Sequence, residues 1–119
     1  MQPAYFFCRD NWTLKKIYVD DVLFLDTNKN YLNIVLGEGE RYKTSRCSLE
    51  EALKQLPADK FARINGSQAV ALEKINYIGR TSLFMEGRGK YELTVSPRYV
   101  QQLRSKILVL GKDRRVKKK

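Results

Sequence analysis

The sequence contains no histidine among its 119 residues and has only two cysteines, Cys8 and Cys47. The two cysteines lie far apart and form no Cys-x-x-Cys motif, so the usual ligand set of a zinc site cannot be assembled. A reduced pair of buried or half-buried thiols is the simpler interpretation, and a disulfide between Cys8 and Cys47 is the alternative. The sequence therefore predicts neither a metal nor a cofactor.

Long apolar runs are also absent, since no stretch approaches the roughly 20 residues that a membrane-spanning helix needs. The opening residues, Met1-Gln2-Pro3-Ala4, lack the basic and apolar regions of a signal peptide. We therefore expect a soluble, cytoplasmic protein.

Residues for catalysis are scarce, because histidine is missing and the acidic residues are scattered through turns and one predicted helix. Asp20-Asp21 is the only adjacent acidic pair outside that helix, and it falls between two predicted strands. Aspartate is an ordinary turn residue in such a position. We expect that the protein is not an enzyme.

Positive charge is plentiful, with a formal net charge of +10. Residues 112–119 hold six basic groups and one acid, which leaves +5 on residues 1–111. We expect one folded domain over residues 1–111 and a basic, disordered tail over residues 112–119. A basic folded body favours an anionic partner, with nucleic acid as the first candidate and an anionic membrane surface as the second.

Short runs of β-branched and aromatic residues predict many strands and a mainly β fold. Two Gly-x-Gly sequences, Gly37–Gly39 and Gly87–Gly89, are typical of tight hairpins, and neither is followed by the helix of a phosphate-binding loop. The predicted strands cover residues 5–9, 14–19, 22–26, 31–36, 41–46, 61–64, 69–72, 75–78, 83–86 and 91–95.

Two short helices are predicted. The first covers residues 48–56, where Ser48 and Glu51 form a capping box and Pro57 ends the run. The second begins at Ser96-Pro97, with Ser96 as N-cap, and has an apolar face at Val100, Leu103 and Ile107.

Three polar segments between these elements suit DNA binding, which needs some side chains for phosphates and others for base edges. The first runs from Thr27 to Tyr31 and contains Lys29, Asn30 and Tyr31, the second runs from Arg63 to Gln68, and the third is Ser96 to Tyr99. Arg98 is the strongest candidate, because arginine pairs with guanine through two hydrogen bonds. The residues alone do not show that the segments converge, and no helix-turn-helix, zinc finger or basic zipper is present.

The order of these landmarks resembles the LytTR family of bacterial DNA-binding domains, and the similarity spans roughly residues 5 to 108. The matching stretches are Val22-Leu23-Phe24-Leu25-Asp26 with Asn30-Tyr31, Ser48-Leu49-Glu50-Glu51 to Leu56-Pro57, Phe61-Ala62-Arg63-Ile64, and Val95-Ser96-Pro97-Arg98-Tyr99.

This resemblance implies an elongated stack of small antiparallel β-sheets whose loops enter successive major grooves of double-stranded promoter DNA. It also implies that the DNA site consists of paired direct repeats, to which a second copy of the protein binds, and that a two-component or quorum-sensing system controls the protein. Carried over by position, the three contacting loops fall on Lys29, Asn30 and Tyr31, on Asn65, Gly66 and Ser67, and on Arg98 and Tyr99.

The sequence departs from the family pattern in two places. Asn65-Gly66 stands where many members have histidine followed by arginine or asparagine, and Ala71 stands where an asparagine is usual. Members usually carry a receiver domain with a phosphorylatable aspartate, and none precedes Tyr5, so we expect a stand-alone version, a natural fragment or an excised piece.

Two functions from different classes follow. The first is a transcription regulator that recognises a specific DNA sequence. The second is a protein-interaction or regulatory module of the same fold, whose DNA affinity is non-specific and salt-dependent. RNA binding is less favoured, because no strand carries an aromatic RNA-binding motif.

Overall fold

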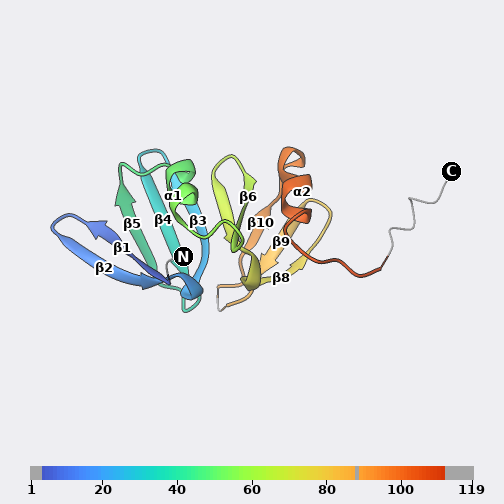
Figure 1. Ribbon diagram of the computed structural model, residues 1–119, viewed down its shortest axis with the longest axis horizontal. Coiled ribbons are helices and arrows are strands. Elements are labelled where there is room, and N and C mark those ends of the chain that lie inside the picture. The colour runs from blue at the N-terminus through green and yellow to red at the C-terminus, as the bar shows by residue number, and fades with distance from the viewer. Residues whose placement is uncertain (1–3, 88, 112–119) are drawn as a thin grey trace.

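The computed structural model describes residues 4–87 and 89–111, and the predicted tail at residues 112–119 lies outside this part of the chain. The molecule is elongated, with extents of 60 × 31 × 24 Å. Three antiparallel sheets follow one another along the long axis (Figure 1). The predicted fold class, mainly β with two short helices in a stack of small sheets, is confirmed.

The central sheet has five strands in the order β5-β4-β3-β7-β6. Gly39 has φ +94°, and the backbone N–H of Leu36 donates to Glu40 O at 2.8 Å, so the predicted hairpin at Gly37–Gly39 is confirmed. The strands are β3 (Val22–Asn28), β4 (Tyr31–Leu36), β5 (Arg41–Ser45), β6 (Phe61–Asn65) and β7 (Gln68–Ala71).

A hairpin and a three-stranded sheet flank the central sheet at its two ends (Figure 1). The hairpin packs against β5 and consists of β1 (Tyr5–Asp10) and β2 (Thr13–Tyr18). The three-stranded sheet has the order β10-β9-β8, with bounds β8 (Ile75–Ile78), β9 (Ser82–Met85) and β10 (Glu92–Thr94).

Two 3₁₀ turns correct the predicted strand ends. Val19 and Leu72, assigned to strands from their apolar character, instead begin the turns η1 (Val19–Asp21) and η2 (Leu72–Lys74). Val19 is buried there, so its hydrophobicity serves the core and not strand pairing.

The first helix, α1 (Leu49–Gln55), has the predicted capping box. The backbone N–H of Glu51 donates to Ser48 Oγ at 3.0 Å, and that of Ser48 donates to Glu51 Oε1 at 2.9 Å. Both bonds satisfy amide groups that the first helical turn leaves free, which fixes where the helix begins.

The second helix, α2 (Pro97–Arg104), is shorter than its apolar pattern predicted. Pro97 occupies the first turn as expected, but the Ser96 side chain makes no capping bond, and its backbone N–H donates to Ile64 O at 2.8 Å. Leu103 is buried, whereas Ile107 lies past the helix end. The helix start is therefore fixed by a tertiary contact with β6.

Two hydrophobic clusters occupy opposite faces of the central sheet. Leu25 and Ile34 pack with β1, β2 and α1, whereas Leu23 and Val35 pack with the three-stranded sheet and α2. A strand that is buried on both faces has a nearly continuous run of apolar residues in its sequence. This arrangement leaves the strand ends, with their polar loops, as the exposed edges.

Candidate nucleic-acid interface

The first predicted loop is the tight turn between β3 and β4. Lys29 has φ +56°, and both Lys29 and Asn30 are exposed. Tyr31 is 46% exposed, and Lys43 Nζ lies 4.9 Å from the centre of its ring. The turn thus projects a cation, an amide and an aromatic ring from one end of the central sheet.

The second loop joins β6 to β7 and is held in shape by the Asn65 side chain. Asn65 Oδ1 accepts from the backbone N–H of Ser67 at 2.9 Å and from Ser67 Oγ at 3.2 Å. Asn65 Nδ2 donates to Gln68 Oε1 and to Thr94 O, each at 2.9 Å. Gly66 and Ser67 are exposed, whereas Asn65 is half-buried with its amide engaged inside the protein.

The third segment is the first turn of α2. Arg98 is exposed, and its guanidinium carbon lies 5.5 Å from the centre of the Tyr99 ring. The guanidinium carbon of Arg63 lies 5.7 Å from the same ring, which is half-buried. Cation–π attraction therefore orders these three side chains together.

Hydrogen bonds bring the three segments to one edge. The backbone N–H and Oγ1 of Thr27 donate to Ser67 O at 2.8 and 3.2 Å, which joins the first loop to the second. Asn65 Nδ2 bonded to Thr94 O, and Ser96 N–H bonded to Ile64 O, join the second loop to the start of α2. The β3–β4 and β6–β7 loops lie along the upper side of Figure 1.

Arg63 was named from the sequence as the start of the second segment and within a family-matching stretch, with no role assigned, and its side chain holds the second loop in place. Its Nε donates to Asn65 O at 3.3 Å, and one of its terminal nitrogens donates to Gly66 O at 2.8 Å. The signal in the sequence was an arginine inside the apolar run of residues 61–64. Thr27 was named only as the start of the first segment and Thr94 was not named, because their contacts come from distant parts of the chain.

Acidic residues near this edge include Asp26 and also Glu50, which lines a concavity together with Arg63 and Arg98. Burial raises the pKa of Asp26, a β3 residue, against the smaller lowering effects of Arg41 and of a hydrogen bond from Gln68. Within residues 4–87 and 89–111, the ion pairs join Lys60 to Asp20 at 3.6 Å and to Glu73 at 3.9 Å, at the other end of β3 and β7. The loop cations Lys29 and Arg98 thus have no carboxylate partner among the described residues.

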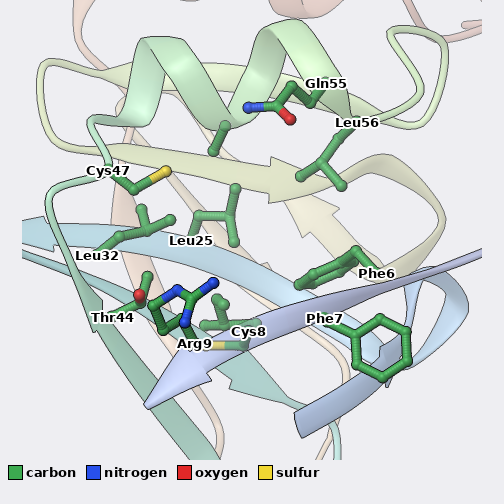
Figure 2. A pocket seen from close by; sticks show the side chains of 12 residues that line it. Phe6, Phe7, Cys8, Arg9, Leu25, Leu32, Thr44, Cys47, Gln55 and Leu56 are labelled. Carbon is green, nitrogen blue, oxygen red and sulfur yellow. The ribbon is translucent and has the colours of Figure 1, made fainter. Parts of the chain in front are cut away.

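Away from the loops, a concave region with a volume of about 390 Å³ lies between β1 and α1 (Figure 2). Phe6, Leu25 and Leu32 give it an apolar wall, and both cysteines line it. Cys8 and Cys47 are free thiols, and burial is the main cause that raises the pKa of each. A raised pKa disfavours the nucleophilic thiolate, so the pair lacks the usual feature of a reactive cysteine.

No group of three or more histidine, cysteine, aspartate or glutamate residues is arranged to hold a metal within the described part of the chain. None of the helices described is long and apolar enough to cross a bilayer.

This chain matches a known family of DNA-binding domains. The model of the LytTr DNA-binding domain matches residues 13–108. One solved structure, the LytTr DNA-binding domain of a Bacillus cereus protein described as a methyl-accepting/DNA response regulator, superposes with a TM-score of 0.71. It is 18% identical, and the match covers 87% of this chain and 96% of that one, which shows a shared fold. No curated protein sequence gives a match. Because the family model covers most of the chain, this protein belongs to the LytTR family of DNA-binding domains.

Proposed function

We propose that the protein is a transcription regulator that recognises a specific double-stranded DNA sequence through the three joined loops. The observation that carries this proposal is their convergence, because Thr27–Ser67, Asn65–Thr94 and Ile64–Ser96 bonds hold three exposed polar segments on one edge. A DNA-binding function at the family level follows from the match over residues 13–108, and that family is not one of enzymes.

Each exposed loop residue has a chemical role in this proposal. Arg98 reads a guanine in the major groove, and Lys29 neutralises a phosphate. Asn30 and Tyr31 contact base edges or sugars beside Lys29. Gly66 and Ser67 let the backbone approach the duplex closely, while Asn65 and Tyr99 position the exposed groups beside them.

The cognate site is identified by selecting sequences from a random duplex pool with residues 1–111 at physiological salt. We expect a short motif, with two direct repeats about one helical turn apart if a second copy binds. Failure to enrich any motif, together with binding that vanishes as salt rises, would overturn the proposal.

Arg98→Ala then tests the base contact on the selected site. We expect a loss of about 1–3 kcal/mol, or roughly 5- to 150-fold in Kd, with relaxed preference at one base pair. Arg98→Lys keeps the charge but not the paired hydrogen bonds, so it should not restore discrimination. Arg104→Ala, an exposed arginine in the last turn of the same helix, is the matched control and should change Kd little. Equal Kd values for wild type and Arg98→Ala would remove Arg98 from the site.

A second candidate is an interaction module with only non-specific DNA affinity. The specific observation in its favour is that the second loop presents no long base-reading side chain, since Gly66 has none and the Asn65 amide is engaged internally. This candidate predicts that removal of residues 112–119 abolishes DNA binding. A protein truncated at residue 111 that still protects one sequence would exclude it.

The response-regulator origin of the solved LytTr domain suggests the regulatory setting. We propose that an upstream signalling protein controls this domain, in the cytoplasm, at promoters.

A further inference from the structure

A groove of about 900 Å³ lies between the β1–β2 turn and strand β5. Four cationic side chains line it, and Asp10 is its one acidic lining residue. The cations are Arg9, Arg41, Lys43 and Arg46. All four are exposed, and none has a carboxylate within 4.0 Å among residues 4–87 and 89–111. The groove therefore concentrates positive charge that no internal ion pair neutralises.

The charge is uneven between the two ends of the central sheet. The cationic groove runs along β5, and Arg46, just past its last residue, lies at the end that carries the loops. A groove at the other end, beside the β4–β5 turn, is lined by Asp21, Glu38 and Glu40 with Lys74 as its one cation. A chain that spread its excess charge evenly would not produce this contrast. An anion approaching the protein is therefore drawn toward the end that carries the loops.

The cationic groove continues the edge formed by the three loops. Tyr31 belongs to the first loop and also lines the groove, and it pairs across the strands with Ser45. In the next polar row, Gln68 faces Asp26, Asp26 faces Asn33, and Asn33 faces Lys43. Polar residues in register thus cross the sheet from the second loop to the groove.

The tip of the hairpin adds a feature that lies outside the match to the LytTr domain model, which begins at residue 13. Arg9 and Asn11 come from this segment and line the groove. Trp12, the one tryptophan of the chain, sits in the same turn and is 97% exposed. This ring is available as a reporter of whatever enters beside it.

We infer that this groove binds the phosphate backbone of the same DNA, outward from the first loop, and lengthens the footprint beyond the segment read by the loops. The inference rests on the proposed function. Such a contact is independent of sequence and acts through release of condensed counterions, so each phosphate bound steepens the salt dependence of log K by about 0.9.

The test compares a short duplex that carries the selected motif alone with a duplex extended by about ten base pairs on each side. The double variant Arg9→Ala/Arg46→Asn removes two groove charges; asparagine is chosen because Arg46 has φ +59°, which asparagine tolerates. We expect wild type to bind the long duplex about 3- to 30-fold more tightly than the short one. The variant should lose this advantage, and its salt slope on the long duplex should fall by about 1.8.

The matched control is Lys74→Ala/Lys90→Asn. It removes the same charge near the opposite end, where Gly87 packs against Gly37, and Lys90 at φ +52° also suits asparagine. The control should keep the advantage of the long duplex. Trp12 fluorescence should change with the long duplex and not with the short one.

Three outcomes separate the inference from the proposed function. Equal affinity and salt slope for wild type and the Arg9/Arg46 variant on the long duplex would overturn the groove inference and leave the loops intact. A wild type without sequence preference, whose slope still falls in the variant, would overturn the proposed function and keep the groove as a phosphate site. A variant that loses binding to anionic lipid vesicles, but not to DNA, would also overturn the groove inference.

Discussion

Asn65→Ala should destabilise the protein, because the Asn65 amide joins the second loop to strand β10. Three short hydrogen bonds, each of 2.9 Å, connect this amide to Ser67 N, Gln68 Oε1 and Thr94 O. A hydrogen bond contributes about 0.5–1.5 kcal/mol net, and water replaces part of that at a half-buried position. We therefore expect a loss of about 1.5–3 kcal/mol in the free energy of unfolding.

Urea unfolding followed by circular dichroism measures this loss. Asn76→Ala is the matched control, since Asn76 is exposed on β8 and should give a change within about 0.5 kcal/mol. Asn65→Asp keeps the acceptor for Ser67 N–H but loses both donors and places a carboxylate against Thr94 O, so its stability should fall below that of wild type.

DNA-binding measurements show whether Asn65 holds the second loop in shape or contacts a base directly. If Asn65 positions the loop, Asn65→Ala weakens binding to matched and mismatched sites alike. An unchanged free energy of unfolding, combined with lost discrimination at a single base pair, would refute this reasoning and make Asn65 a base-reading residue.

Two further predictions concern titratable groups. The raised pKa of Asp26 means that the folded protein binds a proton more tightly than the unfolded chain, so stability falls as pH rises from the ordinary value of 3.8 through the raised one. Asp26→Asn should therefore raise the urea midpoint at pH 7 and not at pH 3; a lower midpoint at pH 7 would contradict this. Burial raises the pKa of Cys8 and Cys47, so iodoacetamide should label both thiols more slowly in the folded protein than in urea, with buried Cys8 the slower. Mass spectrometry at pH 7.5 measures the labelling, and equal rates for the folded and the urea-unfolded protein would contradict the packing.

Local patterns in the sequence determined most of the secondary structure. The Ser48–Glu51 capping box fixed the start of α1, because both of its bonds lie within four consecutive residues. The hairpin at Gly37–Gly39 was predictable for the same reason, since Gly39 supplies the positive φ that the turn needs.

Elements that depend on distant contacts were predicted less well. Ser96 was expected to cap α2 with its side chain, yet its backbone bonds to Ile64, which lies 32 residues earlier. Val19 and Leu72 have the composition of strand residues, but burial in the core can be satisfied equally by a 3₁₀ turn.

The candidate site divides in the same way. Composition, net charge, loop position and the family resemblance were enough to name Lys29, Asn65 and Arg98 as candidate DNA-binding residues, because each of these properties can be read from the sequence. These residues lie on one edge because β3 pairs with β7 and α2 packs on β6. The two contacts bring together residues that are about 40 and about 30 positions apart in the sequence. The same folding engaged the Asn65 amide internally and gathered Arg9, Arg41 and Arg46 around one groove. Sequence supplies the side chains, whereas strand register and packing decide which of them face the same partner.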